Sequence, residues 1–303
     1  MDWGTKQLTS ILTDVGFDAV GHGQALVAGI SSFTHSQPNT LTFWKFSDPP
    51  TADDVADLAR GVIVITKHST TRVLANQGIA AIGVSDPRAA FAVLSAAIAP
   101  SKPAVGIDPT AIVSSQAIVD PSASIGAGSI IGDETRVGAH SRVGNYCVVH
   151  PGVWIEGNVE IGDHTVIGGP GFGYVNLPSG DTIRVPHLGS VQIGRGAHIG
   201  SHVAIDRGTL DNTFIGENSR IDNLVHIAHN VHIGAGAMVI AGAEVSGGAV
   251  VGDGAWIAPQ ASVREHVTIG EKATVGLGSV VVRDVLPGST VAGVPARELS
   301  SEK

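Results

Sequence analysis

A six-residue repeat runs through most of the chain after residue 104 and limits what the chain can fold into. From Ile107 to Ile167 an aliphatic residue recurs at every sixth position, and the spacing returns at Ile193 and again from Ile215 to Val281. This period fits neither a helix nor a simple hairpin. It is typical of a parallel β-helix, in which each hexad forms one short strand and one corner. Three hexads close a triangular rung, so residues eighteen apart stack directly on one another.

The composition agrees with thin, repeated layers. Hydrophobic residues make up 43% of the 303 residues but aromatic residues only 4%, and there are 40 glycines. A formal charge of −9 argues against nucleic-acid binding but leaves room for a small anionic ligand. The N-terminus has no basic segment before an apolar run, and no long apolar stretch occurs elsewhere. We therefore expect a soluble, cytoplasmic protein without a membrane span.

The only cysteine, Cys147, excludes a disulfide within the chain. It lies four residues after Val143, in the slot that other hexads fill with alanine, serine or threonine. We therefore predict that Cys147 is a small filler of the core and not a catalytic thiol.

The domain organisation follows from where the repeat begins and ends. Residues 1–103 predict a small α/β domain, residues 104–285 the β-helix, and residues 286–303 a tail that leaves the repeat without a long helix. Proline-rich Pro100–Pro103 marks the boundary. In the first domain we expect helices at 5–15 and Pro87–Ala99 and buried strands at Val62–Ile65 and Ile79–Val84.

Two segments interrupt the repeat. Residues 168–192 are too long for a corner and predict an excursion loop, a type of segment that often carries function. The segment Asp206–Thr213 is a shorter corner insertion. Within it, Asp206 and Arg207 either line a groove or pair with one another.

Three histidines lie three residues apart at His226, His229 and His232. The repeat places His229 at a corner and points His226 and His232 outward from adjacent faces of the prism. Because the three side chains diverge, we predict no metal site here.

The stacking rule gives His229 a specific neighbour. Gly247 follows it by eighteen residues and occupies the same corner one rung on. An imidazole base beside a bare backbone N–H suits acyl transfer, because the base removes a proton from an amine and the N–H stabilises the oxyanion. Asp222, in the preceding hexad, is a candidate for orienting the imidazole. A solvated surface histidine remains the alternative for His229.

Several motifs resemble the UDP-3-O-acylglucosamine N-acyltransferase family of the lipid A pathway. They are GGPGFGY from Gly168, VPHLGSVQIG, IDRGTLDNTFIG and IDNLVHIAHNVHIG. The N-terminal GISSFTHSQPNTLTFW stands where that family has its uridine-binding domain. The resemblance implies a left-handed parallel β-helix and a homotrimer with active sites between subunits. It also implies transfer of an acyl group from a thioester to the amine of a UDP-linked sugar.

The resemblance assigns roles to individual residues. His229 matches the general base, Gly247 the oxyanion donor, and His266 a second histidine near the nucleotide sugar. Asn223 is a further candidate for substrate binding. Phe43 matches an aromatic that stacks on uracil, and a second aromatic would be Trp44 or Phe46. Phe172 and Tyr174, in the excursion loop, contact the acyl chain or the sugar, or else anchor the loop on a neighbouring subunit.

The donor is left open between acyl carrier protein and acyl-CoA, and no cofactor is implied beyond that thioester co-substrate. The C-terminal STVAGVPAR resembles acetyltransferases that use coenzyme A. In that case Arg283 and Arg297 contact phosphates, although both also fit solvated surface positions. One alternative function is acyl-CoA-dependent N-acylation of another nucleotide-linked amino sugar. A second is a non-catalytic sugar-binding scaffold, against which the pairing of His229 with Gly247 argues.

Overall fold

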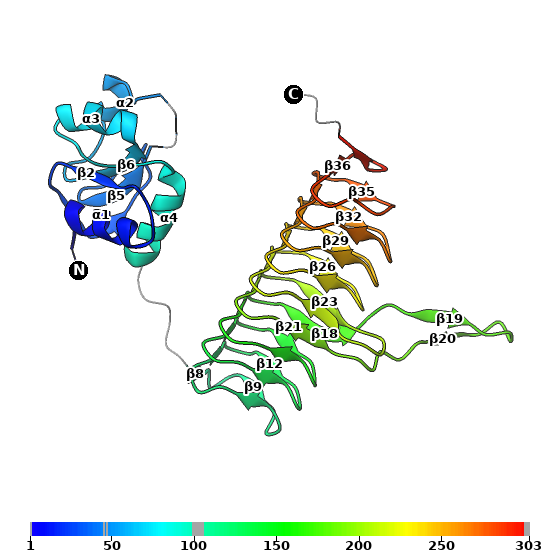
Figure 1. The fold of residues 1–303 in the computed structure, drawn as a ribbon. Helices are drawn as coiled ribbons and strands as arrows, with labels where there is room; N and C mark the ends of the chain where they lie inside the picture. Colours follow the sequence, from blue (N-terminus) through cyan, green and yellow to red (C-terminus); the bar gives the residue numbers. More distant parts are fainter. Residues whose placement is uncertain (1, 45, 47, 99–105, 300–303) are drawn as a thin grey trace. The chain divides into compact units, whose positions relative to one another are not determined.

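A computed structural model describes residues 2–44, 46, 48–98 and 106–299 of the chain. The chain divides into two compact units, Met1–Pro103 and Ala104–Lys303 (Figure 1). The predicted boundary at Pro100–Pro103 lies outside the described residues.

The N-terminal unit is a five-stranded sheet with helices packed against it (Figure 1). The sheet order is β2 (Val20–His22), β7 (Ala80–Val84), β6 (Ile63–Lys67), β5 (Thr40–Phe43) and β4 (Gly29–Ile30), with only β2 antiparallel to its neighbour. The other elements are β1 (Trp3–Gly4), β3 (Leu26–Val27), α1 (Thr5–Asp14), α2 (Ala52–Ala56), α3 (His68–Asn76) and α4 (Pro87–Ile98). The two predicted strands and the two predicted helices are confirmed, with Ala99 outside the described residues.

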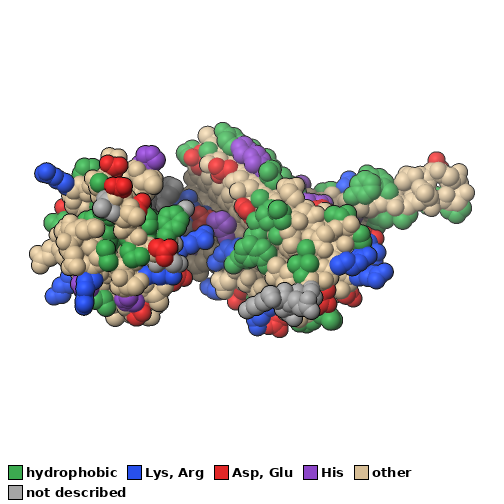
Figure 2. All heavy atoms as spheres, turned by 90° about the horizontal axis from the view of Figure 1, so that it is seen from above, with side chains coloured by type: hydrophobic (Ala, Val, Ile, Leu, Met, Phe, Trp, Pro, Cys, Tyr) green, Lys and Arg blue, Asp and Glu red, His purple; other side chains and the backbone are tan. Residues whose placement is uncertain are grey.

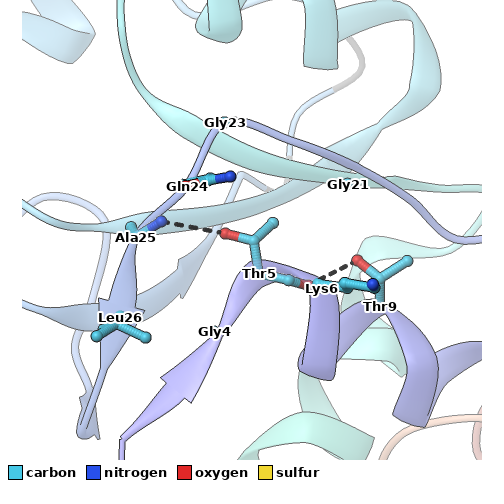
Figure 3. A pocket seen from close by; sticks show the side chains of 9 residues that line it. All are labelled: Gly4, Thr5, Lys6, Thr9, Gly21, Gly23, Gln24, Ala25 and Leu26. Atoms are coloured by element: carbon cyan, nitrogen blue, oxygen red, sulfur yellow. Dashed lines mark hydrogen bonds between the residues drawn. The ribbon is translucent and has the colours of Figure 1, made fainter.

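A cavity of about 600 Å³ opens in this unit beside the start of α1. Figure 3 shows the residues that line it, which come from the end of β1, the start of α1, and the stretch from β2 to β3. The lining residues include Lys6, Thr9 and Gln24.

The second unit is a β-solenoid with three sheets, one for each side of the triangular rung, and their strands are parallel except at β37. The first face contains β8 (Gly106–Ile107), β11 (Ser124–Ile125), β14 (Arg142–Val143), β17 (Glu160–Ile161), β22 (His198–Ile199), β25 (Arg220–Ile221), β28 (Met238–Val239), β31 (Trp256–Ile257), β34 (Thr274–Val275), β36 (Thr290–Ala292) and β37 (Arg297–Glu298). The second face contains β9 (Ile112–Val113), β12 (Ile130–Ile131), β15 (Val148–Val149), β18 (Val166–Pro170), β23 (Ala204–Arg207), β26 (His226–Ile227), β29 (Glu244–Val245), β32 (Ser262–Val263) and β35 (Val280–Val281). The third face contains β10 (Ile118–Val119), β13 (Arg136–Val137), β16 (Trp154–Ile155), β21 (Val191–Ile193), β24 (Thr213–Ile215), β27 (His232–Ile233), β30 (Val250–Val251) and β33 (Thr268–Ile269).

The hexad slots behave as the repeat predicts. The aliphatic residues fill the axis, and Ile227 and Val245, neighbours on β26 and β29, have no exposed surface. Polar residues in the small slot bond to the backbone of later rungs: the Ser129 hydroxyl donates to the Gly144 carbonyl at 2.7 Å. Cys147 occupies this slot fully buried, and burial raises the pKa of its thiol. Its predicted role as a core filler is confirmed.

The excursion loop contains an antiparallel hairpin of β19 (Tyr174–Asn176) and β20 (Thr182–Arg184). The hairpin extends away from the side of the solenoid (Figures 1 and 2), and hydrophobic side chains lie along it. The tail beyond residue 285 departs from the six-residue spacing, but it continues the first face of the solenoid. There β36 pairs in parallel with β34, and β37 folds back on β36.

Candidate active site

The candidate site is built around His229, in the corner that follows β26. Because Ile227 pairs with Val245, Gly247 lies at the same corner one rung on. A Cβ built on Gly247 would lie 2.7 Å from Cε1 and 2.8 Å from Nε2 of His229, so the bare backbone of Gly247 rests directly against the imidazole. The predicted proximity of these two residues is confirmed. The Gly247 N–H has no acceptor among the described residues.

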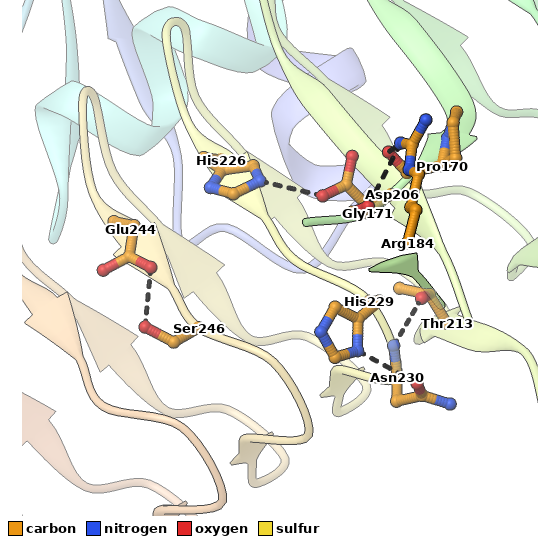
Figure 4. A network of polar contacts seen from close by, with 10 residues as sticks. All are labelled: Pro170, Gly171, Arg184, Asp206, Thr213, His226, His229, Asn230, Glu244 and Ser246. Carbon is orange, nitrogen blue, oxygen red and sulfur yellow. Dashed lines mark hydrogen bonds and ion pairs between the residues drawn. The ribbon is translucent and has the colours of Figure 1, made fainter. Parts of the chain in front are cut away.

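Asn230 determines which nitrogen of His229 carries the proton. The Oδ1 atom of Asn230 accepts hydrogen bonds from the Thr209 backbone N–H at 3.0 Å and from the Thr209 hydroxyl at 2.9 Å. This atom also lies 3.1 Å from Nδ1 of His229 (Figure 4). Because an amide oxygen only accepts, Nδ1 of His229 is the donor, and in the neutral ring Nε2 keeps its lone pair. His229 is therefore arranged as a base at Nε2, the atom next to Gly247.

The shorter insertion supplies the support for Asn230. Thr209 binds the Asn230 side chain, and the Thr213 hydroxyl accepts from the Asn230 backbone N–H at 2.9 Å. Sequence reasoning missed both threonines and Asn230. The signal for the two threonines was the interruption of the repeat itself, which adds a loop at the His229 corner.

Replacing Asn230 with glycine tests this support. Glycine tolerates the left-handed φ of 59° at this position but removes the acceptor for His229. We expect kcat for acyl transfer to fall about tenfold to a hundredfold, the cost of losing a hydrogen bond to a group that becomes charged. Asn218→Gly is the matched control, because Asn218 holds the same corner position with φ of 54° away from His229. Equal kcat values for the two variants would contradict the role of Asn230.

The base of the hairpin covers the other side of His229. A Cβ built on Gly171 would lie 2.9 Å from Cδ2 of His229 and 3.0 Å from Nε2 of His187. The His187 and His229 rings lie 5.0 Å apart at 63°. Arg184 holds this segment in place through bonds from Nη2 to the Pro170 and Gly171 carbonyls, both at 3.3 Å (Figure 4). His187 was not selected from the sequence.

Asp206 and Arg207 do not pair with one another. Asp206 lies 3.1 Å from Nε2 of His226 (Figure 4), and this contact raises the pKa of His226. Arg207 donates instead to the Gly168 and Pro151 carbonyls, at 2.7 and 2.8 Å. Of the two alternatives, pairing is wrong, since Asp206 binds a histidine and Arg207 secures the start of the excursion loop.

The pair formed by Asp206 and His226 predicts a pH-dependent contribution to stability. Because the folded pKa of His226 is raised, the contribution is complete below the unfolded value of about 6.5 and is lost as pH rises through the folded pKa. His226→Gln should therefore lower the melting temperature more at about pH 5.5 than at about pH 8.5. The side chain is 45% exposed, so the effect should stay below about 1 kcal/mol. If His226→Gln lowers the melting temperature by the same amount at both pH values, the pairing of His226 with Asp206 is contradicted.

Asp222 and Asn223 lie at the corner before His229. The Asp222 carboxylate accepts from the backbone N–H groups of Asn223 at 2.7 Å and Ala241 at 3.2 Å, so it caps its own corner. The predicted orienting role of Asp222 is therefore wrong within this chain, and Asn230 fills it. The Asn223 side chain likewise accepts from the Ser201 backbone N–H at 2.7 Å.

His266 lies one rung beyond Gly247 on the same edge. Its backbone N–H donates to the Gly247 carbonyl at 3.1 Å, and a Cβ on Gly248 would lie 2.5 Å from its Nδ1. The Gly247–Gly248 corner is therefore enclosed between the rings of His229 and His266. The structure therefore brings the predicted residues His229, Gly247 and His266 together along one edge of the solenoid.

The other predicted residues of the second unit lie farther from His229. Phe172 is 85% exposed and packs on Tyr174 with ring centroids 5.0 Å apart, just after Gly171. The strand register places Arg283 on the His229 edge, two rungs beyond Gly247, because Val263 pairs with Val281. Arg297 is exposed on β37, at the end of the first face.

In the N-terminal unit, Phe43 is half-buried and packs on Phe91 at 4.6 Å. It is not among the residues that line the cavity of Figure 3. Trp44 is 8% exposed and its indole N–H donates to the Asp48 carbonyl, whereas Phe46 is 53% exposed. Of the two candidates for a second stacking aromatic, only Phe46 offers an accessible ring.

Neither a membrane-spanning helix nor a metal cluster is present in the described residues. They contain no helix with the length and apolar character needed to cross a bilayer. They also contain no cluster of three histidine, cysteine or acidic side chains placed to hold a metal ion.

Comparisons with known proteins agree with this geometry. Residues 212–247, which include both His229 and Gly247, match the family described as bacterial transferase hexapeptide (six repeats). The chain is 33% identical over 245 residues to the UDP-3-O-acylglucosamine N-acyltransferase of Coxiella burnetii, which covers 75% of this chain and 70% of that protein. It is 39% identical over 241 residues to the enzyme of the same name from Xanthomonas oryzae pv. oryzae, covering 73% and 69%. Among solved structures, the UDP-N-acetylglucosamine O-acyltransferase of Moraxella catarrhalis superposes with a TM-score of 0.59 at 26% identity, over 64% of this chain and 73% of that one.

Proposed function

Because the chain belongs to the UDP-3-O-acylglucosamine N-acyltransferase family, we propose that it transfers an acyl group from a thioester to the amine of UDP-3-O-acylglucosamine. The observation that supports this proposal best is the contact between the Nε2 side of His229 and the bare backbone of Gly247. A base and a backbone donor side by side are what acyl transfer to an amine requires.

In the proposed mechanism the amine nitrogen attacks the thioester carbonyl carbon. Nε2 of His229 takes the proton that the nitrogen loses, while Nδ1–H stays bonded to Asn230. The Gly247 N–H stabilises the oxyanion of the tetrahedral intermediate. When the intermediate collapses, the carbon–sulfur bond breaks and His229 returns the proton to the leaving thiolate. An amide and a free thiol result, and the base is regenerated.

The remaining predicted residues act in binding in this proposal. His266 and Asn223 contact the nucleotide sugar, and Phe43 with Phe46 contacts the uracil. Phe172 and Tyr174 line the path of the acyl chain. We propose a homotrimer, so that a neighbouring subunit completes the groove beside the His229 edge, and we expect the enzyme in the cytoplasm, where its thioester donors occur.

The donor is proposed to be acyl carrier protein or acyl-CoA, both of which carry a phosphate near the pantetheine arm. Arg283 supports this part of the proposal, because it is exposed on the His229 edge two rungs beyond Gly247. A guanidinium at that position offers paired donors to a phosphate. No cofactor besides the thioester is needed.

The test is a transfer assay followed by mass spectrometry of the product. Purified protein is supplied with UDP-3-O-acylglucosamine and either acyl carrier protein or coenzyme A thioesters. Product is expected from at least one donor, with the added acyl group on the sugar nitrogen. The same sugar with its amine already acetylated is the matched control and should give no product. Absence of transfer from every thioester would overturn the proposal and favour a sugar-binding scaffold.

A further inference from the structure

His187 is a buried imidazole in direct contact with the proposed base. It lies just after β20, where the excursion loop returns to the solenoid, and only 7% of its surface is exposed. Its ring meets the His229 ring at 5.0 Å and 63°. The proposed reaction as described above gives this residue no part.

One nitrogen of His187 has no partner. Nδ1 lies 3.1 Å from the Val185 carbonyl oxygen, which only accepts, so Nδ1 carries the proton. In the neutral ring Nε2 is then an acceptor with a free lone pair. This atom is buried and has no hydrogen-bond partner among the described residues. A buried acceptor without a partner destabilises the folded protein, so its presence calls for a physical reason.

The unpartnered atom borders His229. A Cβ built on Gly171 would lie 3.0 Å from Nε2 of His187 and 2.9 Å from Cδ2 of His229, so both atoms face the same small space. Cδ2 is bonded to Nε2 of His229, the atom that takes the proton. Nε2 of His187 and the Cδ2 edge of His229, next to the base nitrogen, therefore border the same space beside the Gly171 backbone.

The surroundings of His187 favour its neutral form. Burial is the largest cause of the lowered pKa of His187, and the neighbouring His229 lowers it further; the Val185 carbonyl and Asp206 oppose this, and Arg184 adds the smallest lowering effect. These are the charged and titratable groups that face it from the hairpin, the insertion and the adjacent corner. A neutral imidazole keeps its lone pair near pH 7, while a second cation beside His229 would repel the imidazolium.

We infer that His187 is a positioning residue that stabilises the protonated form of His229 during acyl transfer. This inference rests on the proposed role of His229 as the base. In the resting enzyme the lone pair of His187 faces a neutral ring and is unsatisfied. When His229 gains the amine proton, the facing edge becomes positive and the lone pair stabilises it. The interaction is stronger in the transition state than in the ground state, which is the condition for accelerating the chemical step. No proton passes to His187.

The test compares His187→Phe, which keeps an aromatic ring without the lone pair, with His187→Gln, which offers an amide oxygen as acceptor. We expect His187→Phe to lower kcat roughly tenfold to a hundredfold with KM for the sugar unchanged. Because the imidazolium is less stable, the acid limb of the kcat/KM profile should move to lower pH. His187→Gln should recover part of both effects. His202→Phe, at an exposed histidine stacked on His164 at another corner, is the matched control and should leave both unchanged.

An NMR titration gives a readout that does not need turnover. The protonation midpoint of the His229 ring should be lower in His187→Phe than in the wild type. In the wild type, the nitrogen-15 signal of His187 Nε2 should shift as His229 is protonated, a measurement that needs no variant. If His187→Phe folds and leaves both the acid limb and the His229 midpoint unchanged, the inference is wrong, whatever happens to kcat. If no thioester supports transfer but His187→Phe still lowers the protonation midpoint of His229, the proposed function is wrong and the interaction between His187 and His229 is supported.

Discussion

Replacing His229 with alanine is expected to lower kcat for acyl transfer by about two to four orders of magnitude, the usual contribution of a general base. Nε2 of His229 carries a free lone pair beside Gly247, and Nδ1 donates its hydrogen bond to Asn230. No other side chain of the described residues has both features at this corner. KM for the sugar should change little, because the lost interaction develops as the proton moves. The measurement is steady-state kinetics with saturating donor.

His232→Ala is the matched control for this variant. His232 comes from the same short stretch, but it points outward from the third face, where its ring stacks on Phe214 at 4.7 Å. We expect its kcat to stay within about twofold of the wild type. Unimpaired transfer by His229→Ala would contradict the assignment of the base, and an equal loss in His232→Ala would indicate a general effect on folding.

The part of the site that the sequence predicts is the part that the repeat controls. Ile227 and Val245 are eighteen residues apart and pair on adjacent strands, so the residues two positions later, His229 and Gly247, must stack. His266 was assigned from the family resemblance, although its place eighteen residues after Gly248 puts it at the neighbouring corner position by the same rule. These relations need only the period of the hexads, and no knowledge of side-chain conformation.

Apart from Asn230, the residues that were missed lie where the repeat is interrupted. Thr209 and His187 reach the site from segments outside the hexad register, and the paths of these segments depend on contacts such as those of Arg184 and Arg207 with backbone carbonyls. A period cannot predict these contacts.

Asp222 was misassigned for a different reason. A carboxylate near a corner binds the nearest free N–H groups, here those of Asn223 and Ala241, before it reaches another corner. Six residues along the chain correspond to the next corner of the rung, so a hexad neighbour is not a spatial neighbour at the same corner. The pairing of β36 with β34 was not predicted, because the spacing of the tail departs from the repeat.

Gly247→Ala should lower kcat nearly as much as His229→Ala does. The added Cβ would lie 2.7 Å from Cε1 and 2.8 Å from Nε2 of His229, so the imidazole or the corner must move. The backbone is not the obstacle, because Ala235 and Ala241 occupy the same position in the two preceding corners. We expect kcat to fall by about two to three orders of magnitude, the range seen when the donors to an oxyanion are disturbed.

The double variant His229→Ala/Gly247→Ala tests whether the effect of Gly247→Ala comes from the contact between the added Cβ and the imidazole. In the wild type, Gly247→Ala should lower the free energy of unfolding by about 1–3 kcal/mol, the cost of overpacking. In the His229→Ala background the ring is absent, and the same change should cost almost nothing. Denaturant unfolding of the four proteins measures this coupling. Full activity in Gly247→Ala, or equal costs in both backgrounds, would mean that the imidazole and the glycine backbone are not in contact, and the proposed chemistry would lose its geometric basis.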